Sequence, residues 1–238
     1  MSATLENVPV KYEDLIQDIQ RGQVKIPQFQ RKFVWTLQAS AKLLDSIMKG
    51  YPIGTFIYWK TNDRLRSIRN LGNIDLPEPK QGDYINYVLD GQQRLTSLFA
   101  ALKGIVIQDE EGNSTDYSRI FVDLEAESDE EVIITDIEGR SEVEIIKLTD
   151  LMKNDFIQLG KYPQKYFQKL SHYQKTLQSY AFSVINLKNA EIDVATEVFT
   201  RLNVGGRALT LFEIMVAKTY HVYPDNSDEN YHVFDLSE

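Results

Sequence analysis

Short apolar runs and amphipathic stretches alternate along the chain, which predicts a mixture of strands and helices. Apolar residues at helical spacing predict helices over residues 12–21, 37–49, 92–102, 148–159, 163–180, 192–202 and 211–220. Runs rich in β-branched and aromatic residues predict strands over residues 24–26, 55–59, 86–89, 105–107, 120–124, 132–134, 143–146 and 182–187. This mixture indicates an α/β protein of the α+β type.

The stretch YVLDGQQRLTSL at residues 87–98 predicts a strand, a tight turn and a helix in immediate succession. Asp90 is a candidate cap for this helix, and Gly91 permits backbone angles at the turn that a side chain would resist. The polar residues of the first helical turn are Gln92, Gln93 and Arg94. Free backbone N–H groups and the positive end of the helix dipole favour an anion there. Two interpretations fit the pattern: a phosphate site and a solvated first turn.

Two further stretches combine arginine, amide side chains and a tight backbone. After Pro27, a polar tip is surrounded by the aromatic residues Phe29, Phe33 and Trp35. The tip consists of Gln30, Arg31 and Lys32. A second, glycine-rich turn lies between two predicted helices and contains Arg201, Asn203, Gly205, Gly206 and Arg207. Either stretch can bind a ligand, but core packing of the aromatic residues is an alternative for the first, and an ordinary helix–helix corner is an alternative for the second.

Charge and composition exclude several functions. The net charge of −9 argues against non-specific DNA binding over the whole surface, although a local basic site is compatible with it. Because the chain has no cysteine, disulfides, thiolate metal sites and cysteine nucleophiles are excluded. The acidic run at residues 125–131 lacks turn glycines and fixed ligand spacing, so it predicts a solvated connector rather than a metal site.

The sequence predicts neither a signal peptide nor a membrane span. Its first residues lack a basic segment followed by an apolar one, and no apolar run approaches the roughly 20 residues that cross a bilayer. Together with the missing cysteines, this favours a cytoplasmic location and no membrane partner. The polar, acidic tail at residues 224–238 contains no closing element, which is compatible with a piece of a longer protein.

Three motifs in a fixed order resemble a known family. They are IPQFQRKFVW at residues 26–35, VLDGQQRLTSL at 88–98 and VFTRLNVGGRALTLFEI at 198–214, with GYPIGTF at 50–56 between the first two. In this order they resemble the N-terminal domain of the GmrSD family of modification-dependent (type IV) restriction systems, within the ParB/sulfiredoxin-like superfamily. The resemblance extends from about Leu5 to Lys218. It implies a mixed sheet with flanking helices, followed by a mainly helical C-terminal part.

The resemblance also implies roles for individual residues. The family's Asp-Gly-Gln-Gln-Arg motif is associated with nucleotide binding and hydrolysis, which makes Asp90, Gln92, Gln93 and Arg94 the catalytic candidates. The implied nucleotide-binding residues are Gln30, Arg31, Gly91, Arg94, Thr96, Arg201, Asn203, Gly205 and Gly206. Mg²⁺ is expected with the nucleoside triphosphate, without a distinction between ATP, GTP, CTP and UTP. Asp90 has three open roles: holding a metal-bound water, orienting the attacking water, or capping the helix.

Two departures from the related proteins narrow the chemistry. Sulfiredoxin-like members carry a catalytic cysteine in a Gly-Cys-His-Arg element, whereas residues 91–94 read Gly-Gln-Gln-Arg here, which excludes thiol chemistry. Family members usually carry a C-terminal His-Asn-His nuclease domain, but His172, His221 and His232 lie in no such motif. We therefore expect a nuclease in another domain or a partner subunit.

The function implied by the resemblance is a nucleotide-binding, NTP-hydrolysing regulatory domain of an anti-phage restriction system. Its expected partners are a nucleotide, a nuclease domain or subunit, and DNA that carries a modification. A sensor of nucleotide or modified DNA without turnover is the alternative, and a ParB-like DNA nickase is a weaker one. The expected plan is a ParB-like core over residues 1–107, an acidic insertion over 108–160 and a helical part over 161–238, in one compact unit.

Overall fold

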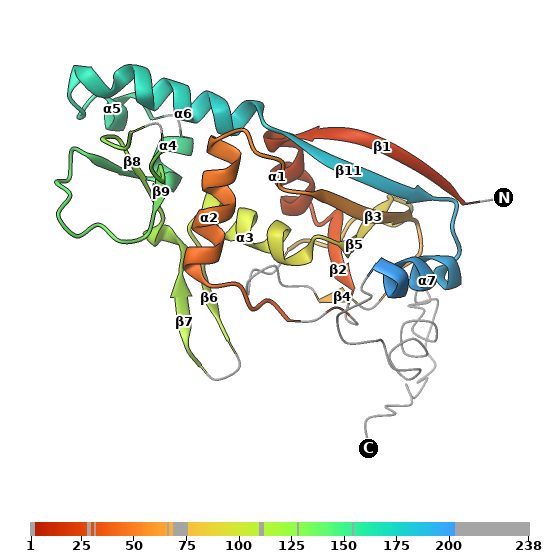
Figure 1. Ribbon diagram of the computed structural model, residues 1–238. Coiled ribbons are helices and arrows are strands. Elements are labelled where there is room, and N and C mark those ends of the chain that lie inside the picture. Colours follow the sequence, from red (N-terminus) through yellow and green to blue (C-terminus); the bar gives the residue numbers. More distant parts are fainter. Residues whose placement is uncertain are drawn as a thin grey trace.

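A mixed β-sheet runs through the protein in the strand order β1-β11-β3-β5-β2-β4 (Figure 1). Its strands are β1 (Thr4–Lys11), β2 (Val24–Pro27), β3 (Thr55–Thr61), β4 (Ser67–Ile68), β5 (Ile85–Asp90) and β11 (Ala181–Lys188). The computed structural model describes residues 3–27, 30, 32–65, 67–68, 76–109, 112–127, 129–153 and 155–202. β11 is parallel to β3 and antiparallel to β1, while β5 is antiparallel to β3 and parallel to β2.

The sequence pattern did not predict two strands of this sheet, the two-residue strand β4 and the eight-residue strand β1. The residues of β1 are mostly exposed, and Pro9 in its second half argues against a strand in the middle of a sheet. The strand forms because every residue from Thr4 to Lys11 pairs with β11. Since β1 is the end strand of the order, a proline there does not interrupt a ladder on both sides.

Helices cover both faces of the sheet. They are α1 (Tyr12–Gln20), α2 (Leu37–Met48), α3 (Gln92–Lys103), α4 (Leu148–Lys153), α5 (Phe156–Leu159), α6 (Phe167–Ser179) and α7 (Ile192–Leu202). Val88 packs in the same cluster as Leu95 of α3, to which α1, α2 and α6 also contribute. Its neighbours Tyr87 and Leu89 pack with Phe199 of α7. Because side chains alternate along a strand, α3 and α7 lie on opposite faces.

The predicted helices that fall on described residues are confirmed with small changes at their ends, except that the helix predicted over residues 148–159 is divided into α4 and α5. The helix predicted over residues 211–220 lies outside the described residues. Thr36 caps α2 as expected, because its Oγ1 accepts from the backbone N–H of Ala39 at 3.2 Å. The predicted helix over residues 163–180 begins as a 3-10 turn, Gln164–Tyr166, and continues as α6. Leu170 and Leu177 lie on the buried side of this helix, whereas Phe167 is 45% exposed.

A second, smaller sheet has the order β10-β8-β9, and β6 pairs with β7. The strands are β6 (Val106–Gln108), β7 (Ser114–Asp116), β8 (Phe121–Asp123), β9 (Ile133–Ile134) and β10 (Ile145–Lys147). Together with the main sheet and its helices they confirm the α+β class. The three-part division of the chain stays a prediction, although β11 of the third part lies between β1 and β3 of the first.

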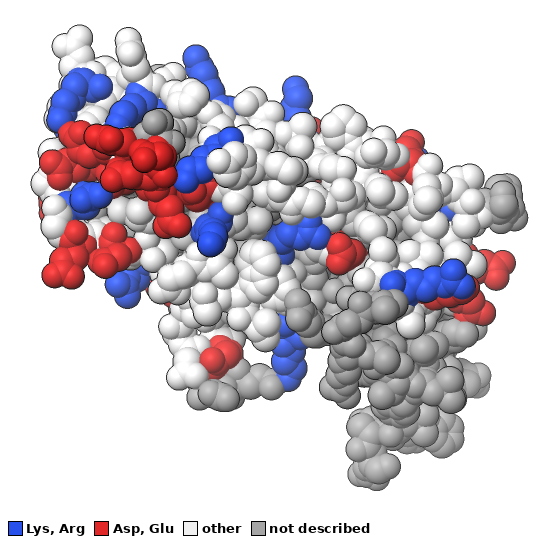
Figure 2. Space-filling view, in the orientation of Figure 1, with Lys and Arg blue, Asp and Glu red and all other residues white. Residues whose placement is uncertain are grey.

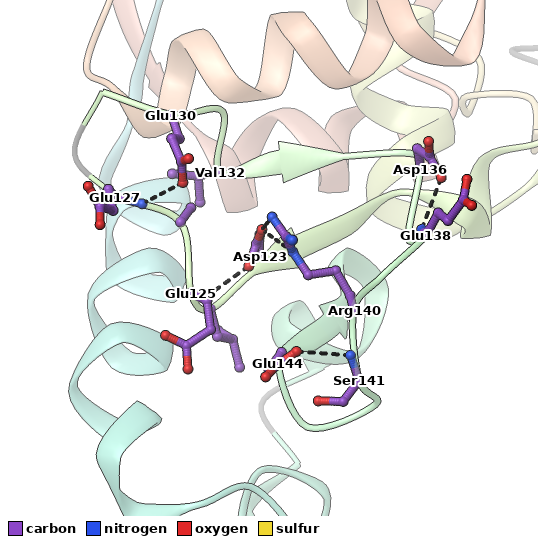
Figure 3. Close-up of polar contacts among 12 residues, drawn as sticks. Asp123, Glu125, Glu127, Glu130, Val132, Asp136, Glu138, Arg140, Ser141 and Glu144 are labelled. Atoms are coloured by element: carbon purple, nitrogen blue, oxygen red, sulfur yellow. Dashed lines mark hydrogen bonds and ion pairs between the residues drawn. The ribbon is translucent and has the colours of Figure 1, made fainter.

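Acidic side chains gather over the end of the molecule that carries β8 and β9 (Figure 2). The exposed ones in this region are Glu125, Glu127, Asp129, Glu130, Glu131, Asp136, Glu138 and Glu142. Some of these carboxylates accept from nearby backbone N–H groups, as Glu130 does from Glu127 and Asp136 from Glu138 (Figure 3). Such contacts are typical of acidic residues in surface turns.

Two buried carboxylates hold this acidic region in place. Asp123 accepts from Nε and Nη2 of Arg140 at 2.8 and 2.7 Å, which fixes the connector between β9 and β10 (Figure 3). Asp45 of α2 accepts from the N–H groups of Val132 and Ile133 at 2.7 and 3.2 Å. Helix α2 is therefore attached to β9 by its own side chain as well as by apolar packing.

Candidate functional site

The turn between β5 and α3 is built on Gly91, whose φ of +94° lies in the left-handed region. A Cβ atom at this position would lie 2.5 Å from Cδ1 of Phe56, so the turn also needs a residue without a side chain. Gly91 itself occupies the cap position, and no side chain caps α3. The predicted cap role of Asp90 is therefore wrong, because its carboxylate is turned to Arg94 instead.

Arg94 makes contacts on three sides. Its Nη1 donates to the carbonyl oxygen of Ile53 at 2.7 Å, and its Nη2 donates to Thr55 O at 3.1 Å and to Asp90 Oδ2 at 3.0 Å. The guanidinium also lies over the ring of Phe56, 5.4 Å from its centre. Arg94 therefore joins the end of β5 to the beginning of β3.

Gly54 is a site residue that the sequence analysis missed. Its φ is +87°, and an added Cβ atom would lie 2.3 Å from Nη1 of Arg94. The absence of a side chain gives the guanidinium the space in which it reaches the two flanking carbonyl groups. The GYPIGTF segment carried a signal for this, because a glycine at a strand often marks a place where another group closely approaches the backbone.

Gln93 is buried and connects α3 to the loop before α2. Its Nε2 donates to the carbonyl oxygen of Lys32 at 2.8 Å, and its Oε1 accepts from the N–H of Val34 at 2.9 Å. From the opposite direction, Nε2 of Gln30 donates to the carbonyl oxygen of Val88 in β5. The structure thus brings the first and second motifs together through two amide side chains.

The remaining residues of the first two turns of α3 are also buried. Gln92 is 6% exposed, and Thr96 one turn later is 2% exposed. No hydrogen-bond partner is found for Oγ1 of Thr96 within the described structure. The first-turn interpretation of Gln92 and Gln93 as solvated side chains is therefore wrong, since both are covered by protein.

The third motif is described only in part. Arg201, near the end of α7, pairs with Glu197 on the same helix, and α7 covers the face of the sheet opposite α3. The structure thus shows no contact between Arg201 and the other two motifs within the described residues. The predicted site residues Arg31, Asn203, Gly205 and Gly206 lie outside the described residues, as does Arg207 of the same turn.

The aromatic residues of β3 and of the loop before α2 are mainly packing residues. Tyr58 is 3% exposed, and burial raises the pKa of its phenol above the ordinary range. The ring of Phe33 lies 6.1 Å from that of Tyr117, whose hydroxyl donates to the carbonyl oxygen of Trp35 at 3.0 Å. Phe29 lies outside the described residues.

Comparison with known proteins is consistent with these motifs. The family model described as "GmrSD restriction endonuclease, N-terminal domain" matches residues 12–220. The chain belongs to this family. An uncharacterised protein of Methanocaldococcus jannaschii is 40% identical over 98 residues, which cover 37% of this chain and 16% of that protein. The chain thus matches only a small part of that relative's length.

Membership of the GmrSD N-terminal family confirms the resemblance that the three motifs indicated. The family match spans all three motif segments, including the residues of the third motif that the structure does not describe. Within the described part of the chain, no helix is long and apolar enough to cross a membrane. The same described residues contain no group of three acidic or histidine side chains arranged to hold a metal ion.

Proposed function

We propose that this GmrSD N-terminal domain binds and hydrolyses a nucleoside triphosphate and thereby controls a nuclease domain or subunit of the restriction system. The observation that carries the proposal is the meeting of two motifs at the N-terminal end of α3, where Gln30 contacts the β5 backbone two residues before Asp90. A helix of 12 residues begins there at Gln92, with Gly91 at the cap position and no side-chain cap. Its first backbone N–H groups favour a bound phosphate.

In this proposal some polar residues of the two motifs bind the phosphates and others orient the attacking water. Gln30, Arg31 and Arg94 bind the phosphates, with the N–H groups of the first turn of α3. Gln92, and in the sequence-based interpretation Gln93, orient the attacking water. Asp90 has the carboxylate of the motif, with 40% of its side chain exposed, and can orient that water or hold a metal-bound one.

The residues present fit a magnesium ion that is carried mainly by the nucleotide. Mg²⁺ keeps several waters and commonly takes one carboxylate together with substrate phosphates. Asp90 is the one carboxylate of the motif, and its Oδ2 already accepts from Arg94. When bound, the ion would neutralise charge on the phosphates, and Asp90 is the residue that would hold it.

Phosphate release measured with ATP, GTP, CTP and UTP tests the proposal. We expect release by the wild type with at least one of them, and a loss of about tenfold or more in Asp90→Asn and Arg94→Ala, since each removes a charged group from the motif. Asp83→Asn is the matched control, because this exposed aspartate precedes the other end of β5. Equal release by all four proteins would contradict the proposal.

A second function, sensing without turnover, is favoured by one observation. The amide of Gln93 and both terminal nitrogens of Arg94 are engaged by protein groups, which leaves fewer groups to act on a reacting phosphate. Calorimetric titration separates the two functions. Micromolar binding of a nucleotide that is never hydrolysed would favour the sensor, whereas steady phosphate release requires the hydrolase.

A further inference from the structure

The amide of Gln93 pairs with the Lys32–Val34 segment in the way that a neighbouring strand would. One side chain donates to the carbonyl oxygen of Lys32 and accepts from the N–H of Val34, at 2.8 and 2.9 Å. We propose that Gln93 is a positioning residue, which holds the loop of the first motif against α3 so that Gln30 stays beside the β5–α3 turn. This inference rests on the proposed function and changes the role of Gln93 within it from orienting water to placing a binding loop.

The geometry of the pairing requires an amide. In an extended segment, the carbonyl of one residue and the N–H of the residue two positions later point to the same side. A single side chain satisfies both only if it carries a donor and an acceptor side by side, as glutamine does. A carboxylate lacks the donor for Lys32, and an apolar side chain of equal length lacks both groups.

Burial makes the two hydrogen bonds effective. Gln93 is 6% exposed, so water is poorly placed to replace either partner when the amide is removed. The two hydrogen bonds, rather than the burial, argue against a role of Gln93 in orienting water, because both polar ends of the amide already have protein partners. Gln92, which is buried to the same extent, has no side-chain hydrogen bond of this kind among the described contacts and remains the candidate for water orientation.

The loop is held at more than one point, and Gln93 provides its hydrogen bonds to α3. The hydroxyl of Tyr117 donates to Trp35 O at 3.0 Å, and Thr36 caps α2 directly afterwards. These contacts fix the end of the loop that leads into α2. At the other end, Gln30 donates to Val88 O, and between these two ends Gln93 holds Lys32 and Val34. Loss of the Gln93 amide should therefore loosen the loop locally without detaching α2.

The test is the separation of KM from kcat in nucleotide hydrolysis. Gln93→Met keeps the length and burial of the side chain but removes both hydrogen bonds. If Gln93 places a binding loop, KM should rise about tenfold, corresponding to about 1.4 kcal/mol, while kcat stays within about threefold. A fall in kcat at unchanged KM would identify a group that acts only in the transition state and would overturn the inference.

A pair of substitutions at Val34 tests the same hydrogen bond from the loop side. Val34 is 65% exposed, so its side chain can change without disturbing the core. Val34→Pro removes the N–H that Gln93 accepts from, whereas Val34→Ala keeps it. We expect Val34→Pro to raise KM as Gln93→Met does and Val34→Ala to leave it unchanged. If Gln93→Met fails to fold, this pair alone decides, and equal KM values for the two variants would overturn the inference.

The inference and the proposed function can fail separately. If the wild type releases no phosphate from ATP, GTP, CTP or UTP, hydrolysis is refuted, and the affinities for the imido analogues of ATP and GTP then decide the role of Gln93. Binding that is about tenfold weaker in Gln93→Met and Val34→Pro than in Val34→Ala would support it. Equal affinities of these three variants would overturn the inference about Gln93. A wild type that binds neither analogue would refute both the proposed function and the inference.

Discussion

Replacement of Gly54 by alanine tests whether Arg94 is held by the backbone that it contacts. The added Cβ atom would lie 2.3 Å from Nη1 of Arg94, at a position whose φ is +87°. The guanidinium is the flexible end of a side chain, so it can move away from the new methyl group. In doing so it would give up hydrogen bonds to the carbonyl oxygens of Ile53 and Thr55, and those bonds set the size of the effect.

The expected loss of unfolding free energy in Gly54→Ala has two parts. The left-handed backbone costs alanine about 1–2 kcal/mol relative to glycine. A hydrogen bond from a charged donor contributes about 1.5–3 kcal/mol, and the lower value applies here because Arg94 is partly exposed and water replaces one of the bonds. The total is about 3 kcal/mol. Gly50→Ala is the matched control: its φ is +70° and its added Cβ atom meets nothing within 4 Å.

Urea unfolding, followed by tryptophan fluorescence, measures both variants, and a double-mutant cycle with Arg94→Ala isolates the contact. In the Arg94→Ala background the Cβ atom of Gly54→Ala has no guanidinium to displace. The second substitution should then cost only the backbone strain, about 1–2 kcal/mol, as in Gly50→Ala. Equal losses for the two glycine variants, or strict additivity in the cycle, would refute the account of Arg94.

Two predictions concern the acidic region. Asp45→Ala should lower the unfolding free energy by about 3 kcal/mol, because the buried N–H groups of Val132 and Ile133 lose their acceptor. Ser46→Ala is the control, and equal urea midpoints for the two variants would contradict the expectation. The hydrogen bond from Lys165 lowers the pKa of Glu125 below its ordinary 4.5, so the stabilisation is complete above that pH and is lost as the pH falls through the lower folded value. The Tm should therefore fall more steeply below about pH 4.5 in the wild type than in Glu125→Gln, and parallel curves would show that the pairing adds nothing.

Local features were predictable from the sequence because their causes lie within a few residues. Thr36 caps α2 through the N–H of Ala39, three residues away, and the strand–turn–helix at residues 85–103 needs only an apolar run, a glycine and a helical stripe. Asp90 shows the limit of such reasoning. An aspartate before a helix is a good cap in isolation, but an arginine four residues later offers a charged partner, and the carboxylate takes it.

Distant partners explain what the sequence analysis missed. β1 has little strand character of its own and forms because β11, far away in the chain, pairs with it along its whole length. Gln93 and Arg94 were expected to face a ligand, yet their hydrogen bonds reach Lys32, Val34 and Ile53. No local pattern contains those partners, so the motif identified the right turn while the direction of each side chain depended on tertiary structure.

The contacts of Arg94 differ in how readily a phosphate could replace them. Its ion pair with Asp90 joins two partly exposed side chains four residues apart, and such pairs contribute only about 0.3–0.5 kcal/mol. Its bonds to Ile53 and Thr55 go to backbone carbonyl groups, which a phosphate does not displace without leaving them unpaired. In the proposed function Asp90 is therefore the partner that yields to the nucleotide, while the two carbonyl groups keep the guanidinium oriented. When a phosphate replaces Asp90 as the partner of Arg94, the one carboxylate of the motif becomes free to contact water or a metal ion. Nucleotide binding and the availability of the Asp90 carboxylate are therefore coupled through Arg94.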